Sequence, residues 1–265
     1  MIADATLRSL AAEAGLSGAS IVVERIDGAG RSLWRAELDG DRPTYPASMI
    51  KVPIALALAH RCAAGTARLE QRVTVDAANM TANDAPSPFV PGYAATLGDL
   101  AHAMLAASDN VATNVLIDAL GRERIGETCR ELGLARTAVR RKLSGSLPLI
   151  DDAGATGRNQ HPAADAAAAL RFLAACGPDA AAWGFVLAAL RAQIWNGKLS
   201  RGWAPGDAFA HKTGDTDEVS HDGGVLTLGG GRRFVVVVYT ELPSSPESDE
   251  RFGAFARLLR PSLAA

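Results

Sequence analysis

The chain has 265 residues, with 27 Lys and Arg against 29 Asp and Glu, so its formal net charge is −2. This near-neutral balance excludes the basic surface of nucleic-acid-binding proteins, and 48% hydrophobic with 21% charged residues excludes a disordered chain. No apolar run approaches the roughly 18 residues of a membrane span. We therefore expect a globular protein with neither nucleic acid nor membrane as a partner.

The predicted elements begin with a helix over Asp4–Ala14. A hairpin follows, with strands at Ala19–Glu24 and Leu33–Leu38 around a Gly-rich turn. The middle of the chain is helical in pattern, and its six predicted helices cover 48–64, 96–106, 109–120, 122–132, 162–176 and 179–194. Three strands and a helix close the chain, at Ala208–Thr213, Gly223–Leu228, Arg233–Thr240 and 248–259.

The order of these elements predicts the architecture. Strands at both ends with helices between them favour an α/β (α+β) fold, in which one antiparallel sheet is built from both ends of the chain. N- and C-terminal helices would flank this sheet, and the helical block would form an inserted all-α lobe. We expect an α/β lobe from about 1–42 and 192–265 and an all-α lobe at about 43–191, within one domain spanning 1–265.

Three cysteines, Cys62, Cys129 and Cys176, lie far apart, and none belongs to a CxxC pair. This spacing argues against a zinc or redox site, and buried free thiols are expected instead. We expect no cofactor and no metal. The N-terminus has no basic segment followed by an apolar one, which predicts a cytoplasmic protein, or a periplasmic or secreted one if a leader has been removed.

The segment Ser48-Met-Ile-Lys51 begins a strongly apolar predicted helix. Residues at i and i+3 share a helix face, so the Ser48 hydroxyl should lie beside Lys51. A serine hydroxyl is a weak nucleophile until a base removes its proton, and a lysine whose pKa is lowered by burial can be that base. Lysine is rare here, with four against 23 arginines, and lysine alone of the two can lose its proton when buried. Chance occurrence of SxxK is the alternative.

Two further polar motifs follow. Ser108-Asp-Asn110 lies between two predicted helices, where a second hydroxyl can relay a proton and an amide can hold a substrate. An ordinary helix N-cap is the alternative. Lys212-Thr-Gly214 ends a predicted strand, where a cation, a hydroxyl and a glycine suit an extended substrate. A plain strand end is the alternative there.

In this order, SxxK, SDN and KTG resemble the signature set of the active-site-serine penicillin-recognising enzymes. The sequences around the first two motifs agree with this resemblance. They are Tyr45-Pro-Ala-Ser-Met-Ile-Lys-Val-Pro53 and Ser108-Asp-Asn-Val-Ala-Thr-Asn-Val-Leu-Ile117. The spacings, 60 residues from Ser48 to Ser108 and 104 from Ser108 to Lys212, are similar to those of class A β-lactamases. The resemblance covers about residues 15–260.

The resemblance implies a serine acyl-transfer enzyme with its site between an α/β lobe and an all-α lobe. Ser48 would be the nucleophile and Lys51 the base or proton relay. Ser108 would pass a proton to the leaving nitrogen, and Lys212 would complete the catalytic set.

The same resemblance implies the residues that bind the substrate. They would be Asn110, Thr213, Gly214 and Asp215. Asn110 would contact the substrate amide and Lys51, while Lys212 and Thr213 would hold a substrate carboxylate. The backbone N–H groups of Ser48 and Asp215 would form the oxyanion hole.

The chain departs from class A enzymes in its long loop. Those enzymes use a loop glutamate to activate the deacylating water, and the corresponding position here falls on Ser144 or Gly145. The stretch 140–150 contains no carboxylate. Asp151 and Asp152 are the nearest acids, and a shifted loop could bring one of them in. Without such a base, we expect slow hydrolysis of the acyl-enzyme.

A second departure follows the KTG motif. Asp215-Thr-Asp217-Glu218 places three acids near the expected carboxylate site. Like charge weakens binding of an anionic substrate unless the acids are turned away or paired, and a solvated turn is the alternative. The next predicted strand lacks the arginine that lactamases often add, and Lys198 or Arg201 could substitute for it.

We therefore expect a class A β-lactamase-like serine hydrolase that forms an acyl-enzyme at Ser48 and hydrolyses β-lactams weakly. Its substrate would be a small molecule (a β-lactam, a peptide or an ester), and the protein would act as a monomer. A DD-peptidase, esterase or acyltransferase acting on a non-lactam substrate is the alternative enzyme. A non-catalytic β-lactam- or peptide-binding domain is the alternative from another class.

Overall fold

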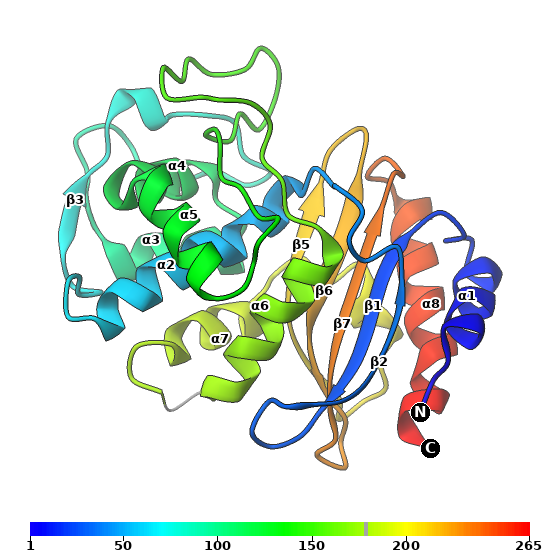
Figure 1. Cartoon of the computed structure of the whole chain (residues 1–265). Coiled ribbons are helices and arrows are strands. Elements are labelled where there is room, and N and C mark those ends of the chain that lie inside the picture. The colour runs from blue at the N-terminus through cyan, green and yellow to red at the C-terminus, as the bar shows by residue number, and fades with distance from the viewer. Residues whose placement is uncertain (178–179) are drawn as a thin grey trace.

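The computed structural model describes residues 1–177 and 180–265 (Figure 1). At its centre is a five-stranded antiparallel sheet with the strand order β2-β1-β7-β6-β5. The strands are β1 (Ser20–Ile26), β2 (Ser32–Leu38), β5 (Ala208–Asp215), β6 (Ser220–Thr227) and β7 (Arg233–Thr240). Because β1 pairs with both β2 and β7, the sheet joins the two ends of the chain, which confirms the predicted architecture.

Helices cover both faces of the sheet (Figure 1). The seven residues of β7 after Arg233 are all buried, as expected for a strand that is covered on both sides. Two helices, α1 (Asp4–Glu13) and α8 (Pro246–Ala264), pack on one face through a cluster that includes Leu7 and Phe252. The other face is covered by α6 (Ala163–Cys176), which contacts β1, β6 and β7.

A second hydrophobic cluster is built around α2 (Lys51–Ala63). Every residue from Lys51 to Ala59 is buried, as expected for a helix that is apolar all round. This central helix contacts α6 and four further helices, α3 (Leu97–Ala106), α4 (Asn110–Leu120), α5 (Arg122–Glu131) and α7 (Gly184–Arg191). Figure 1 shows this group of helices beside the β5 edge of the sheet.

Several details differ from the predicted elements, among them β6, which begins at Ser220, and α8, which extends to Ala264. The α-helix expected from residue 48 begins at Lys51, because Ala47–Ile50 forms a 3-10 turn, η1. The helix expected over 179–194 is α7, which is shorter, and the predicted start at 179 lies outside the described residues. A small two-stranded sheet was not predicted, since three-residue strands are too short to show alternation. Its strands are β3 (Arg72–Thr74) and β4 (Ala94–Thr96).

The three cysteines are free thiols, as predicted, but only Cys129 is buried, while Cys62 and Cys176 are half-buried. Burial raises the pKa of the Cys129 thiol to about 12, so it is not a reactive thiolate at neutral pH. In the described parts of the chain, no helix has the length and apolar character that crossing a membrane requires.

Candidate active site

The segment carrying Ser48 lies where η1 passes into α2. Ala47 has a positive φ of 44°, which non-glycine residues seldom adopt, and side chains at i and i+3 align in a 3-10 turn. Ser48 is half-buried, whereas Lys51 is fully buried. The turn therefore places a partly accessible hydroxyl three residues from a buried amine.

Lys51 links the SxxK motif to the SDN motif. Its Nζ lies 2.6 Å from the Ser108 carbonyl oxygen, 3.0 Å from Ser108 Oγ and 2.8 Å from Asn110 Oδ1. Ser108 has a left-handed φ of 61°, and in this conformation its carbonyl and hydroxyl both contact the same amine. Two residues of the SDN motif thus surround Lys51, as the resemblance implied for Asn110.

Lys212, on the edge strand β5, completes the cluster. Its Nζ lies 2.9 Å from Ser108 Oγ and 2.9 Å from the Thr213 carbonyl oxygen. The Ser108 hydroxyl therefore lies between two buried lysines. Three motifs separated by 60 and 104 residues in the sequence meet at this one hydroxyl.

Burial shifts the pKa of both lysines. It lowers the pKa of Lys51 well below 10.5, and the charge of Lys212 lowers it further. It also lowers the pKa of Lys212 to about 7, although the nearby Asp215 carboxylate acts in the opposite direction. Desolvation disfavours an ammonium ion in such a site. Near neutral pH the cluster can therefore hold a lysine as a free amine.

The hydrogen bonds of the cluster suit more than one protonation state. Two of the three partners of Lys51, the Ser108 carbonyl and the Asn110 amide oxygen, can only accept. The third is a hydroxyl, which can donate or accept. A neutral Lys51 can donate twice and accept from Ser108, while a charged Lys51 donates three times. A proton can thus move through Ser108 without leaving a buried polar group unpaired.

The loop at 81–92 supplies partners that sequence reasoning missed. Asn110 donates its side-chain amide to the Ala82 carbonyl oxygen over 2.9 Å, and its backbone N–H to Asn83 Oδ1 over 2.5 Å. Asp109 accepts a hydrogen bond from the Ala112 N–H over 2.8 Å, so it is the N-cap of α4. Asn83 belongs to no recognisable motif, and its location in a Pro-rich loop gave no signal of this contact.

Gly214 explains how the serine segment reaches β5. A Cβ atom at Gly214 would lie 2.8 Å from the Pro46 carbonyl oxygen and 3.3 Å from Ala47 Cβ. Glycine is therefore required for this close approach of two backbones. The contact holds η1, which includes Ser48, against the end of β5 that carries Lys212 and Asp215.

His221, on β6, also supports the serine segment. Its Nε2 lies 2.9 Å from the Tyr45 carbonyl oxygen, and its ring stacks on Tyr239 with 4.3 Å between centroids. Burial lowers the pKa of His221 to about 4, so the ring is neutral near pH 7. With the proton on Nε2, the Nδ1 atom can accept from the Thr240 N–H at 3.2 Å. His221 therefore holds the backbone at Tyr45, three residues before Ser48, against the sheet.

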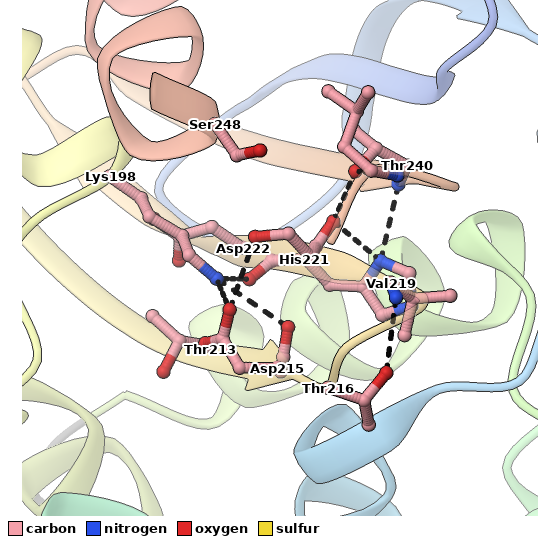
Figure 2. Close-up of polar contacts among 12 residues, drawn as sticks. Lys198, Thr213, Asp215, Thr216, Val219, His221, Asp222, Thr240 and Ser248 are labelled. Carbon is pink, nitrogen blue, oxygen red and sulfur yellow. Dashed lines mark hydrogen bonds and ion pairs between the residues drawn. The ribbon is translucent and has the colours of Figure 1, made fainter. Parts of the chain in front are cut away.

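The three acids after KTG lie in different surroundings, and Figure 2 shows those of Asp215. Asp215 Oδ1 lies 2.5 Å from Lys198 Nζ. Glu218 lies 3.4 Å from Arg158 on the surface, and Asp217 is exposed. Asp217 and Glu218 therefore lie in the solvated turn of the alternative interpretation, whereas Asp215 is paired with a buried lysine.

Lys198 and Arg201, the two candidates to replace the missing arginine, each have a carboxylate partner in the structure. The Lys198 ammonium contacts Asp215 and also donates to the His221 carbonyl oxygen over 3.1 Å. Arg201 Nη2 lies 3.2 Å from Glu250 Oε2. Each cation is already paired with a carboxylate, because the loop before β5 packs against the ends of β5, β6 and α8.

The loop at 143–160 is anchored by Asp152. Its Oδ1 and Oδ2 lie 2.6 and 2.7 Å from Arg122 Nη2, and Oδ2 accepts from the Lys142 N–H over 2.7 Å. Although burial acts to raise the pKa of Asp152, these contacts lower it below the usual value of 3.8. The Asp152 carboxylate is therefore engaged in holding the loop, and Asp151 is exposed.

The loop also shows why one candidate position carries no glutamate. A Cβ atom at Gly145 would lie 1.9 Å from the Ala82 carbonyl oxygen, so no side chain fits there. At the other candidate, Ser144, the hydroxyl accepts a hydrogen bond from the Ile150 N–H over 3.0 Å and closes a turn within the loop. Throughout 1–177 and 180–265, no group of three His, Cys, Asp or Glu side chains could hold a metal ion.

Comparison with known proteins agrees with the motifs and the fold. The model of the β-lactamase enzyme family matches residues 3–261. The chain belongs to this family. Its fold matches that of a β-lactamase from Sphaerobacter thermophilus with a TM-score of 0.78 and 26% identity, covering 97% of this chain and 96% of that one. An ancestral class A β-lactamase also matches with a TM-score of 0.78 and 26% identity, covering 97% of this chain and 99% of the other.

A penicillin-binding relative has the same fold. The mutant of PBP-A solved as an acyl-enzyme with penicillin G matches with a TM-score of 0.83 and 23% identity, covering 99% of this chain and 98% of the other. At that identity the likeness concerns the fold alone. No curated protein matches the chain. Family and fold together are those of β-lactamase-like hydrolases.

Proposed function

We propose that this protein is a serine acyl hydrolase that forms an acyl-enzyme at Ser48 and releases the acyl group slowly. The observation that carries the proposal is the cluster in which Lys51 and Lys212 share the Ser108 hydroxyl. Neither the fold nor an isolated SxxK sequence requires such a cluster, whereas a reaction that moves a proton from nucleophile to leaving group does.

Acylation would use the residues of the three motifs. Neutral Lys51 accepts the Ser48 hydroxyl proton as Oγ attacks the substrate carbonyl carbon. The carbonyl oxygen gains the negative charge, and the backbone N–H groups of Ser48 and Asp215 stabilise it. Loss of one such donor typically costs about 3 to 4 kcal/mol of barrier stabilisation.

Collapse of this intermediate requires a proton on the leaving group. The Ser108 hydroxyl donates it to the leaving nitrogen or oxygen, and an adjacent lysine ammonium returns a proton to Ser108. Asn110 and Thr213 would hold the substrate, and Lys212 in its protonated form would place positive charge beside them. Gly214 permits the close approach that brings Ser48 to this strand.

Slow release follows from the loop at 143–160. The Asp152 carboxylate is bound to Arg122, and the segment 140–150 has no acid. A water molecule would therefore lack the carboxylate base that class A enzymes use for deacylation. This observation also favours the second candidate, a peptidase, esterase or acyltransferase whose acyl-enzyme passes to a nucleophile other than water.

The proposal is tested by intact-mass analysis after mixing with a chromogenic cephalosporin, followed over time. We expect an adduct on the wild-type protein that persists after free β-lactam is removed, and no adduct on Ser48→Ala. Labelling of Ser48→Ala at the wild-type rate would exclude the proposed nucleophile. Rapid turnover without an adduct would show that a base such as Asp151 replaces the glutamate.

A further inference from the structure

The end of β5 carries an ion pair between Asp215 and Lys198, which the sequence did not predict. Lys198 Nζ lies 2.5 Å from Asp215 Oδ1, and the two side chains are 4% and 32% exposed. The Ser220 hydroxyl contacts the same carboxylate oxygen at 3.1 Å. Figure 2 shows the lysine pointing toward the Asp215 carboxylate from the loop before the strand.

Lys198 is held in place from several directions. Its ammonium donates to the His221 carbonyl oxygen over 3.1 Å and lies 5.4 Å from the centre of the Phe252 ring. Within the described residues, Asp215 alone places a carboxylate oxygen within ion-pair distance of Lys198. The charge of this buried cation is thus cancelled mainly by one residue.

Of the other acids near this lysine, Asp222 has its own partners and Asp249 has a raised pKa. Asp222 binds the His211 ring over 2.8 Å and the Leu199 N–H over 3.0 Å. Burial raises the pKa of Asp249. With Asp215 present, the positive charge of Lys198 is neutralised. Without the Asp215 carboxylate, that charge would have no close counter-ion among the described residues.

Asp215 also lies close to the reacting atoms of the proposed site. It follows Gly214, which touches the segment carrying Ser48, and its backbone N–H belongs to the proposed oxyanion hole. Its charge acts on Lys212 as well. A carboxylate this near to the Lys212–Thr213 pair opposes a second negative charge there.

We propose that Asp215 is a specificity-determining residue that selects against a carboxylate at this end of the site, so that the preferred acyl substrate is uncharged there. This inference rests on the proposed acylation of Ser48 and deepens it. The Asp215 side chain neutralises Lys198 and removes the second cation that an anionic substrate would need. Anionic β-lactams then acylate Ser48 more slowly than an uncharged acyl donor of equal reactivity, although Ser48, Lys51 and Ser108 still allow the adduct to form.

Two aryl esters that differ only in charge test the proposal. One has 3-hydroxybenzoate as its leaving group and the other has 3-hydroxybenzamide, with the same acyl group. The measured quantity is the ratio of kcat/KM for the carboxylate ester to that for the carboxamide ester. We expect a ratio below one in the wild-type protein, and a rise of about five- to tenfold in Asp215→Asn, as for one charge acting through partly solvated protein. The asparagine oxygen can still accept from Lys198, which preserves the fold.

Asp217→Asn is the matched control. It removes the same charge two residues away without touching Lys198, so its ratio should stay within about twofold of wild type because exposed charges are screened. Lys198→Met should shift the ratio in the opposite direction, because it leaves Asp215 uncompensated.

The outcomes separate this inference from the proposed function. If the esters acylate Ser48 but Asp215→Asn leaves the ratio unchanged, or Asp217→Asn raises it equally, the specificity role is wrong and the acyl-enzyme stands. If neither ester acylates Ser48 in any variant, the proposed function fails, and the specificity role fails with it.

Discussion

Replacing Lys212 with Met should make the stability of the protein less dependent on pH. The wild-type lysine is fully buried between Ser108 Oγ and the Thr213 carbonyl oxygen. Burial lowers its pKa from 10.5 to about 7, with Asp215 acting in the opposite direction. A methionine fills a similar volume but has no proton to lose.

The sign follows from proton binding in the two states. Between pH 7 and pH 10.5 the unfolded chain keeps the Lys212 proton, whereas the folded protein releases it. The unfolded state therefore binds more protons, and the free energy of unfolding rises with pH by at most about 1.4 kcal/mol per pH unit. Because the slope is about half of this near the folded pKa, the total gain from pH 7 to pH 9 is about 2 kcal/mol.

Urea denaturation followed by tryptophan fluorescence at pH 7, 8 and 9 would measure this difference. The measured quantity is the free energy of unfolding of wild type minus that of Lys212→Met. We expect this difference to increase by about 2 kcal/mol between pH 7 and pH 9. Ser48→Ala keeps both lysines and should follow wild type. Parallel curves for wild type and Lys212→Met would refute the claim that Lys212 is forced toward its neutral form.

Two further predictions concern the long loop. Asp152→Ala should cost about 3 kcal/mol of stability at pH 7, because it leaves Arg122 without its partner; a cost below about 1 kcal/mol in urea melts would show that the pair does not anchor the loop. Since the pKa of Asp152 is lowered, the wild-type advantage should disappear as the pH falls through that lowered value. Gly145→Ala should lower stability by about 1 to 3 kcal/mol, because its Cβ would lie 1.9 Å from the Ala82 oxygen. Gly28→Ala, where a Cβ meets nothing within 4 Å, should be nearly neutral, and equal melting temperatures for the two variants would contradict the argument.

Local pattern was sufficient for most of the elements. The run of valines in β7 and the apolar residues of α2 can be recognised within a window of a few residues. A buried strand or helix has apolar residues at regular positions along the chain, and this pattern predicts the element. The small β3–β4 sheet was missed for the same reason, since three residues contain no repeat. The start of α2 was also wrong, because a 3-10 turn and the first turn of an α-helix have similar sequences.

The candidate site was recognised from motifs, and the structure supplied their geometry. Ser48, Lys51, Ser108 and Lys212 were all proposed from the sequence, but the sharing of one hydroxyl by two lysines is a contact between three distant segments. The Asn83 contact to the backbone of Asn110 had no signal in the sequence. Such contacts depend on where loops cross, and no local pattern records that.

By itself the sequence determined the family and predicted the type of chemistry, because a serine, two lysines, a second hydroxyl and an amide in a fixed order leave few reactions that could use them. Tertiary structure decided which charges remain available. Lys198 and Asp152 both stood in the sequence as candidate functional groups, and each is bound to a partner contributed by another element. The physical reason is that the Coulomb energy of a pair depends on separation in space and on burial, and these are properties of the folded chain.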